Sequence, residues 1–326
     1  MSIKLSSLVC LAVPAVFAFS AAAPAQEKPA GYPSRPIRII ISVQPGAGAD
    51  MIARATAKTL NEKLGQNVVV ESRPGGGGVI ATEQAARATP DGHTLYQNGF
   101  GLLLQGALKR VQFDVLKAFD PIVRSTSQPY ILLAHQSLPA KSVKELIALS
   151  ASKPLTYAGS SGIGSTVHLG MERFAKLSNM KVKYIAYKGS SPAILGLMGG
   201  EINMAAASAM ASIAAINTGK VRGIATLGLT RLPVLPDLPT FAEQGYPGFS
   251  ITNSYYLWTP AGTPSPIVAA LNRFVSDGMH SPEMSKQLAA SGSQPGERMT
   301  PDKLKSAVAK EYAEIVETAK ALDLKF

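Results

Sequence analysis

Residues 39–50 read IIISVQPGAGAD, an apolar run followed by a glycine-rich turn that leads directly into a helical pattern. Two further strand-like runs end in the same way, at the glycine-rich residues 74–78 and 159–166. Glycine lets backbone N–H groups approach a ligand closely, and the helix behind each turn adds the positive end of its dipole. The three turns therefore predict an anion pocket built largely from main chain.

Strands and helices alternate around these turns in two separate units. Residues 37–97 predict the order β-α-β-α-β, and the pattern restarts over residues 155–227. Such alternation is typical of parallel sheets whose ligands bind at the carboxyl ends of the strands. We therefore expect an α/β fold of two domains, each with a mostly parallel sheet flanked by helices.

Two extended segments bracket the second unit and predict where the chain crosses between the domains. They lie around residues 123–127 and 250–256, and the later helices are expected to return to the first domain. At 326 residues the chain is also in the size range where a single core usually divides. The expected division is residues 32–125 plus 254–326 for one domain and residues 126–253 for the other.

The N-terminal residues 1–25 are typical of a cleaved secretory signal peptide. Lys4 precedes an apolar stretch over residues 8–23, and Ala23-Pro24-Ala25 forms a small-residue cleavage site. The apolar stretch contains Pro14 and is short for a bilayer, which disfavours the alternative of a retained anchor. We expect an exported, periplasmic protein without disulfides, because Cys10 in this segment is the only cysteine.

Charge and motif content disfavour nucleic-acid binding and catalysis. The formal net charge of +11 is spread along the chain without a basic run, so it indicates either general solubility or a favourable field for anionic solutes. The turn at residues 46–51 lacks the third glycine of a dinucleotide fingerprint, and Ser161 lacks the Gly-x-Ser-x-Gly pattern of hydrolases. The four histidines show no metal-ligand spacing. We expect no enzyme activity, no cofactor and no metal.

Seven ordered segments resemble the hallmark motifs of the tripartite tricarboxylate transporter substrate-binding proteins, also called Bug receptors. They are YPSRPIR (32–38), the glycine turn ending at Asp50, LGQNVVVESRPG (64–75), PDGHTL (90–95), SSGIGSTVHL (160–169), YKG (187–189) and AGTP (261–264). The resemblance runs from about residue 32 to the C-terminus. It implies a periplasmic, two-domain Venus-flytrap fold that clasps small carboxylates, and two membrane partners, a small and a large subunit.

The resemblance also implies that four segments line the cleft: residues 46–50, 75–78, 159–166 and 206–209. Two of them depart from the family's usual pattern. Gln44, next to the first, stands where an aromatic residue is common, and residues 205–209 read AAASA where Asp and Asn are frequent. Alanines cannot pair with a ligand ammonium, so an amino-acid ligand is disfavoured and a mono- or dicarboxylate, including an aromatic one, is favoured.

Thirteen residues are the candidate ligand-binding set. They are Gln44, Gly46, Ala47, Gly48, Asp50, Gly76 and Gly77 in the first domain, and Ser160, Ser161, Ser165, Thr166, Ala207 and Ser208 in the second. Hydroxyls of the Ser/Thr loop can donate to a carboxylate, although the same residues could simply cap a helix. Asp50 would repel a carboxylate and is given a structural role, and the glycines around residue 76 could equally form a surface turn.

The protein is predicted to be a monomer that captures a carboxylate when its two domains close around it. Delivery to a membrane transporter and presentation to a sensor kinase both require this closure, so the sequence leaves both open. His168 and Trp258 are expected to pack rather than bind ligand. Of the strand at residues 250–257, one face is expected to meet the cleft through Tyr255 or Tyr256 and the other the core.

Overall fold

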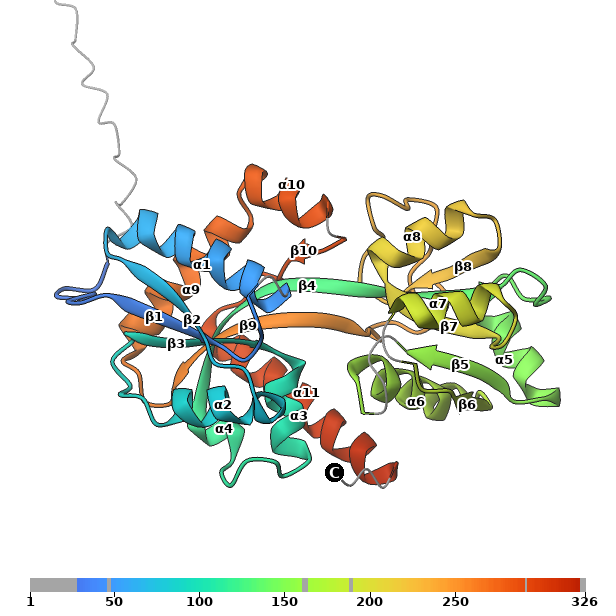
Figure 1. Ribbon diagram of the computed structural model, residues 1–326, viewed down its shortest axis with the longest axis horizontal. Helices are drawn as coiled ribbons and strands as arrows, with labels where there is room; N and C mark the ends of the chain where they lie inside the picture. Colours follow the sequence, from blue (N-terminus) through green and yellow to red (C-terminus); the bar gives the residue numbers. More distant parts are fainter. Residues whose placement is uncertain (1–27, 46–47, 160–163, 188–189, 291, 323–326) are drawn as a thin grey trace, which may run out of the picture.

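The computed structural model describes residues 28–45, 48–159, 164–187, 190–290 and 292–322. Two α/β lobes lie side by side and are joined by the long strands β4 (Phe119–His135) and β9 (Thr252–Pro260) (Figure 1). The predicted two-lobed α/β fold is confirmed. Across the described ranges, no helix has the length and apolar character that crossing a membrane requires.

The first lobe is built on a sheet with the strand order β2-β1-β3-β9-β4, with β10 added to β4. β1, β2, β3 and β4 run in one direction, and β9 and β10 run in the other. The remaining bounds are β1 (Ile37–Ile41), β2 (Val68–Ser72), β3 (Thr94–Gly99) and β10 (Gln294–Pro295).

Helices bury both faces of this sheet, which explains why β1 is isoleucine on both sides. Ile39 packs in a core with α1 (Gly48–Leu64) and α9 (Ser265–Met279), whereas Ile40 packs with α2 (Val79–Ala86), α3 (Phe100–Ala107) and α11 (Pro301–Ala321). Parallel strands covered on both faces read as continuous apolar runs. The lobe also contains the short η1 (Gly76–Gly78) and α4 (Val115–Ala118), and α10 (Pro282–Ala290).

The second lobe has the sheet order β6-β5-β7-β4, with β8 on β4. Its strands are β5 (Leu155–Gly159), β6 (Val182–Tyr184), β7 (Met204–Ser208) and β8 (Val221–Thr226), which all oppose β4 in direction. Its helices are α5 (Val143–Ser152), α6 (Thr166–Ser178), α7 (Ser190–Met198) and α8 (Ala209–Asn217). α5 and α6 cover one face of the sheet, and α7 and α8 cover the other.

β4 changes partners where it passes from one lobe to the other. It pairs with β9 as far as Pro129, and from Tyr130 onward with β7 and β8. The predicted crossings at residues 123–127 and 250–256 lie on or beside these strands. β4 therefore belongs to the sheets of both lobes, and the division into residues 32–125 plus 254–326 and residues 126–253 stays a prediction.

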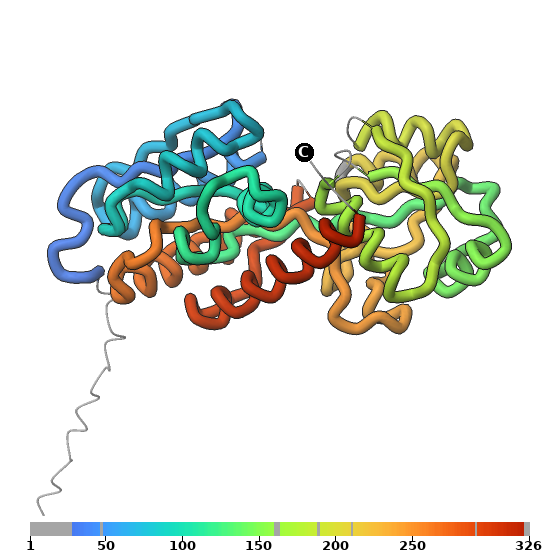
Figure 2. The backbone as a smooth tube through the Cα atoms, turned by 90° about the horizontal axis from the view of Figure 1, so that it is seen from below, coloured from blue at the N-terminus to red at the C-terminus, as the bar shows by residue number. Residues whose placement is uncertain are grey.

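The C-terminal helix α11 contacts both lobes. It packs on α3 and β4 of the first lobe and on α6 of the second, and Figure 2 shows it running from the first lobe towards the second. Arg173 of α6 pairs with Glu314 of α11, and Lys176 pairs with Glu317 at 3.1 Å. The C-terminal helix therefore also contacts the second lobe, in addition to the predicted cover of the first domain.

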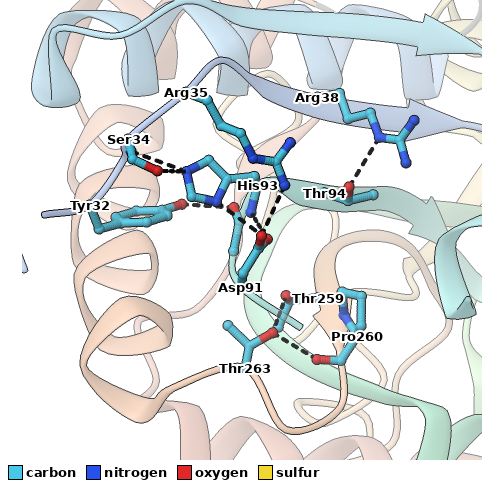
Figure 3. Close-up of polar contacts among 11 residues, drawn as sticks. Tyr32, Ser34, Arg35, Arg38, Asp91, His93, Thr94, Thr259, Pro260 and Thr263 are labelled. Atoms are coloured by element: carbon cyan, nitrogen blue, oxygen red, sulfur yellow. Dashed lines mark hydrogen bonds and ion pairs between the residues drawn. The ribbon is translucent and has the colours of Figure 1, made fainter. Parts of the chain in front are cut away.

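A polar network ties the N-terminal segment to the turn before β3 (Figure 3). Tyr32 donates a hydrogen bond to the Gly92 carbonyl at 2.8 Å, and Arg35 pairs with Asp91 at 2.9 Å. Asp91 also accepts from the backbone N–H of buried His93 at 2.9 Å. Two of the sequence motifs, at residues 32–38 and 90–95, thus bind each other at the amino ends of β1 and β3, and they serve the fold.

Candidate ligand-binding cleft

A pocket of about 420 Å³ lies at the carboxyl ends of β1 and β3, and both lobes line it. From the first lobe come residues that follow or end these strands, together with the starts of α1 and α3. From the second lobe come the loop before α6 and the crossing strands. The described lining is Ser42, Val43, Gly48, Ala49, Asn98, Gly99, Phe100, Gly101, Leu104, Leu108, Arg110, Tyr130, Gly164, Ser165, Thr166, Asn253 and Tyr255.

On the first-lobe side, Gly48 lines the pocket with its backbone alone. A Cβ built on Gly48 would lie 2.9 Å from the hydroxyl oxygen of Tyr255, so a larger residue here would force the phenol to shift. Gly48 is also the first residue of α1, where helical N–H groups lack partners within the helix. The arrangement places a phenol and the positive end of a helix dipole together.

On the second-lobe side, Ser165 and Thr166 begin α6. Ser165 is the N-cap, and its Oγ accepts a hydrogen bond from the backbone N–H of His168 at 3.3 Å. A hydroxyl that accepts this bond still has its own proton to donate. The capping and ligand-binding interpretations of Ser165 are therefore compatible, and the N-termini of α1 and α6 meet in one pocket.

α3 contributes an apolar face that the sequence analysis missed. Phe100, Leu104 and Leu108 are spaced four residues apart and line the pocket on one side. Arg110 follows the helix, and its guanidinium carries the one full charge among the described lining residues. The apolar run at residues 100–104 was the available signal for a helix here, but nothing local indicated that it faces a cleft.

Three described candidates, Gly48, Ser165 and Thr166, come together in the pocket. Gly46, Ala47, Ser160 and Ser161 lie outside the described residues. Gln44 is exposed and Asp50 is buried, and neither is part of the described lining. Asp50 pairs with Arg54 one turn along α1 at 2.9 Å, which gives its carboxylate a partner on its own helix.

The other four candidates are not among the described residues that line the pocket. Gly76 and Gly77 adopt left-handed φ angles of 57° and 63° in η1, and the Gly77 carbonyl accepts from Gln105 at 3.0 Å. Ala207 is fully buried in the second-lobe core, because β7 lies in the interior of its sheet. Ser208 is half-buried at the end of β7.

The packing interpretations of His168 and Trp258 are confirmed. His168 is 6 % exposed, and burial lowers its pKa to about 4. Trp258 is 1 % exposed in the first-lobe core. The neighbours Tyr255 and Tyr256 divide as expected, since Tyr255 lines the pocket and Tyr256 is fully buried on the other face of β9.

Two α/β lobes joined by crossing strands, with a pocket lined from both sides, define a two-lobed solute-binding protein. Residues 52–319 match the tripartite tricarboxylate transporter family receptor, TctC. The chain belongs to this family, and the resemblance found in its motifs is confirmed. Its members are substrate-binding receptors rather than enzymes, which also confirms the expectation of a non-enzymatic protein.

Individual relatives agree with this assignment. The chain is 33% identical over 305 residues to protein BugT of Bordetella pertussis, covering 92% of this chain and 93% of BugT. A crystal structure of a TctC solute-binding protein from Polaromonas, solved with no ligand, matches with a TM-score of 0.79 at 25% identity and covers 89% of this chain and 99% of that one. An R. palustris protein solved with adipate matches with a TM-score of 0.65 at 30% identity, covering 89% and 97%.

Proposed function

We propose that this protein captures a small carboxylate in the pocket between its lobes and delivers it to a tripartite membrane transporter. One observation carries the proposal: the amino ends of α1 and α6, from different lobes, open on one pocket with Ser165, Thr166 and Tyr255. A carboxylate that leaves water needs several donors in return, and charge-assisted hydrogen bonds are the strong ones. Helix N-termini and hydroxyls supply such donors.

The lining favours a ligand with an apolar body. Phe100, Leu104 and Leu108 give no hydrogen bonds to a hydroxylated chain, whereas they shield methylene or aromatic groups from water. Arg110 adds a positive charge at the end of this face. The expected ligand is therefore a carboxylate with an apolar spacer and a second anionic group, and the adipate held by the R. palustris relative has this chemistry.

Capture is proposed to occur by closure of the lobes about β4 and β9. The ligand stabilises the closed form because it contacts both lobes there, and this difference in contacts biases the equilibrium. The chain superposes better on the ligand-free Polaromonas structure than on the adipate complex, although it is more similar in sequence to the latter. This difference supports the interpretation of the present conformation as the open one.

Export and partners complete the proposal. The family is periplasmic, so residues 1–25 are proposed to be removed on export and the monomer to meet a small and a large membrane subunit. A gene-deletion strain tests delivery, because loss of uptake of the bound carboxylate supports transport. Normal uptake with loss of a transcriptional response would instead support a sensor.

Calorimetry tests capture. We expect adipate to bind the wild-type protein and to raise its melting temperature, since a ligand specific to the native state stabilises by mass action. Thr166→Ala should weaken binding about fivefold, corresponding to one lost hydrogen bond, without changing the melting temperature of the free protein. Thr318→Ala, on α11 outside this pocket, is the control. Binding that is indifferent to Thr166 would contradict the proposed site.

A further inference from the structure

The loop that leads into α6 is held by the imidazole of His168. The backbone N–H of Gly164 donates to Nδ1 of His168 at 2.9 Å, and this bond is buried. Gly164 lines the pocket together with the next two residues, Ser165 and Thr166. Because Nδ1 is the acceptor, the ring is neutral and carries its proton on Nε2.

The rest of His168 is fixed as firmly as its Nδ1. Its backbone N–H donates to Ser165 Oγ at 3.3 Å, and its carbonyl oxygen lies 3.3 Å from the Tyr157 hydroxyl oxygen. Its ring lies on that of Tyr184, with the ring centroids 4.1 Å apart. One residue thus restrains two consecutive members of the pocket lining, Gly164 by its ring and Ser165 by its backbone.

We infer that His168 is a positioning residue that holds Gly164 and Ser165 in their binding conformation only while its imidazole is neutral, so that acid weakens ligand binding. A second proton on the ring would sit on Nδ1 and face the N–H of Gly164, which replaces a hydrogen bond with two opposed donors. This inference rests on the proposed ligand pocket.

The surroundings set the pH range of this effect. Burial lowers the pKa of His168 to about 4, so the ring is neutral at pH 7 and becomes protonated as the pH falls towards 4. The titratable groups around it are Tyr157 on β5, Tyr184 on β6 and Glu172 on α6. Burial raises the pKa of both tyrosines, so they stay neutral, and Glu172 accepts from Tyr157 at 2.8 Å. Ligand affinity is therefore expected to fall between about pH 5.5 and 4.

Two substitutions at His168 distinguish the role of Nδ1 as a hydrogen-bond acceptor from the effect of protonating the ring. In His168→Asn the amide oxygen can take the place of Nδ1 and accept from Gly164 without titrating, whereas His168→Leu leaves that N–H without an acceptor. At pH 7, we expect the affinity for adipate to fall about tenfold in His168→Leu and less than threefold in His168→Asn. His280→Asn, a histidine outside the pocket, is the control.

The decisive measurement is the pH profile of adipate affinity from pH 7.5 to 3.5, which extends below the His168 pKa of about 4. Protonation of adipate itself affects all variants equally, so the wild type should lose more affinity than His168→Asn. Identical profiles, or a His168→Leu variant with wild-type affinity, would overturn the inference. Failure of the wild type to bind any carboxylate would instead refute the proposed function.

A ligand-independent measurement completes the test. Nitrogen-15 NMR of labelled histidine distinguishes the two neutral tautomers, and we expect the Nε2–H form for His168 at pH 6.5. The Nδ1–H form would overturn the inference whether or not a ligand is found.

Discussion

The two faces of β9 are built from opposite kinds of groups. One face lines the cleft, and the other belongs to the hinge network, which consists of Arg124, Tyr256 and Glu311. Tyr255 faces the cleft, where its hydroxyl lies next to the backbone of Gly48. Tyr256 faces the other way, donating to Glu311 of α11 at 2.6 Å and accepting from Arg124 of β4 at 3.1 Å. The hinge side is thus a completed network of side chains, whereas the cleft side offers small residues, hydroxyls and helix N-termini.

This difference assigns stability and binding to opposite faces of one strand. Groups that already hydrogen-bond each other change little when a ligand binds. Removing one partner of such a pair lowers the free energy of unfolding. The hydroxyls and helix N-termini that face the cleft are the groups proposed to bind the ligand. Substitutions on the two faces should therefore separate unfolding free energy from ligand affinity.

The largest expected effect is on the hinge side. Arg124→Met removes the positive charge that pairs with Glu311 and donates to Tyr256. Glu311, which is partly buried, and Tyr256, which is fully buried, then both lose this partner. We expect the free energy of unfolding to fall by about 2 kcal/mol, which is below the cost of breaking a fully buried pair because Glu311 is partly exposed. Urea denaturation measures the loss, and calorimetry should show affinity within twofold of wild type.

Arg298→Met is the matched control for this prediction. Arg298 pairs with Asp277 at 2.6 Å on the exposed surface, where such pairs contribute less than about 1 kcal/mol. Equal losses for Arg124→Met and Arg298→Met would mean that the hinge network has no special role in stability.

The next effect lies on the cleft side, at Arg110. Arg110→Gln should lower the affinity for adipate about tenfold, because a charged partner of the second carboxylate is lost. Lys109→Gln removes the same charge one residue away, outside the pocket lining, and should leave affinity within twofold. If the two variants weaken binding equally, a long-range field rather than local contact is responsible.

A smaller effect tests the close approach at Gly48. The added methyl group of Gly48→Ala would lie 2.9 Å from the Tyr255 hydroxyl oxygen, so the phenol must shift within the cleft. We expect adipate affinity to fall about threefold, a moderate effect because a side chain can move where backbone could not. Adding Tyr255→Phe removes the crowded oxygen together with a hydroxyl donor of the proposed site, so the double variant should bind no better than Gly48→Ala. A double variant that recovers wild-type affinity would contradict the proposed contact of the Tyr255 hydroxyl with the carboxylate.

Local patterns predicted the parts of the molecule that depend on neighbours in sequence. The apolar run of β1 followed by a glycine turn identified a parallel strand and the sheet edge at which the described pocket lies. Ser165 and Thr166 were found for the same reason, because an N-cap and a glycine-rich loop leave a short-range signature. The two-lobed order followed from the repeated alternation of strands and helices.

Residues that reach the cleft only through tertiary packing were not predicted from the sequence. The apolar run at the start of α3 was a signal for a helix, but nothing in the local sequence indicated that Leu104 and Leu108 reach the cleft. Arg110 and Tyr130 arrive there only after α3 and β4 have packed. Ala207 was predicted to line the cleft, but it packs in the second-lobe core instead, since the pairing of β7 between β4 and β5 was not visible in its sequence.

The smallest expected effect is at the outer ion pair between α6 and α11, which connects the lobes without entering either the hinge network or the cleft. Lys176 and Glu317 are 71% and 74% exposed, so Lys176→Gln should lower the free energy of unfolding by less than about 0.5 kcal/mol in urea denaturation. The loss should vanish in 0.5 M salt, because exposed charges are screened within a few ångströms there. Lys58→Gln, whose partner Glu283 lies 3.3 Å away within the first lobe, controls for a general surface charge effect. A loss above 1 kcal/mol at Lys176 alone would contradict the comparison, since stability between the lobes would then depend on their outer contact rather than on the hinge.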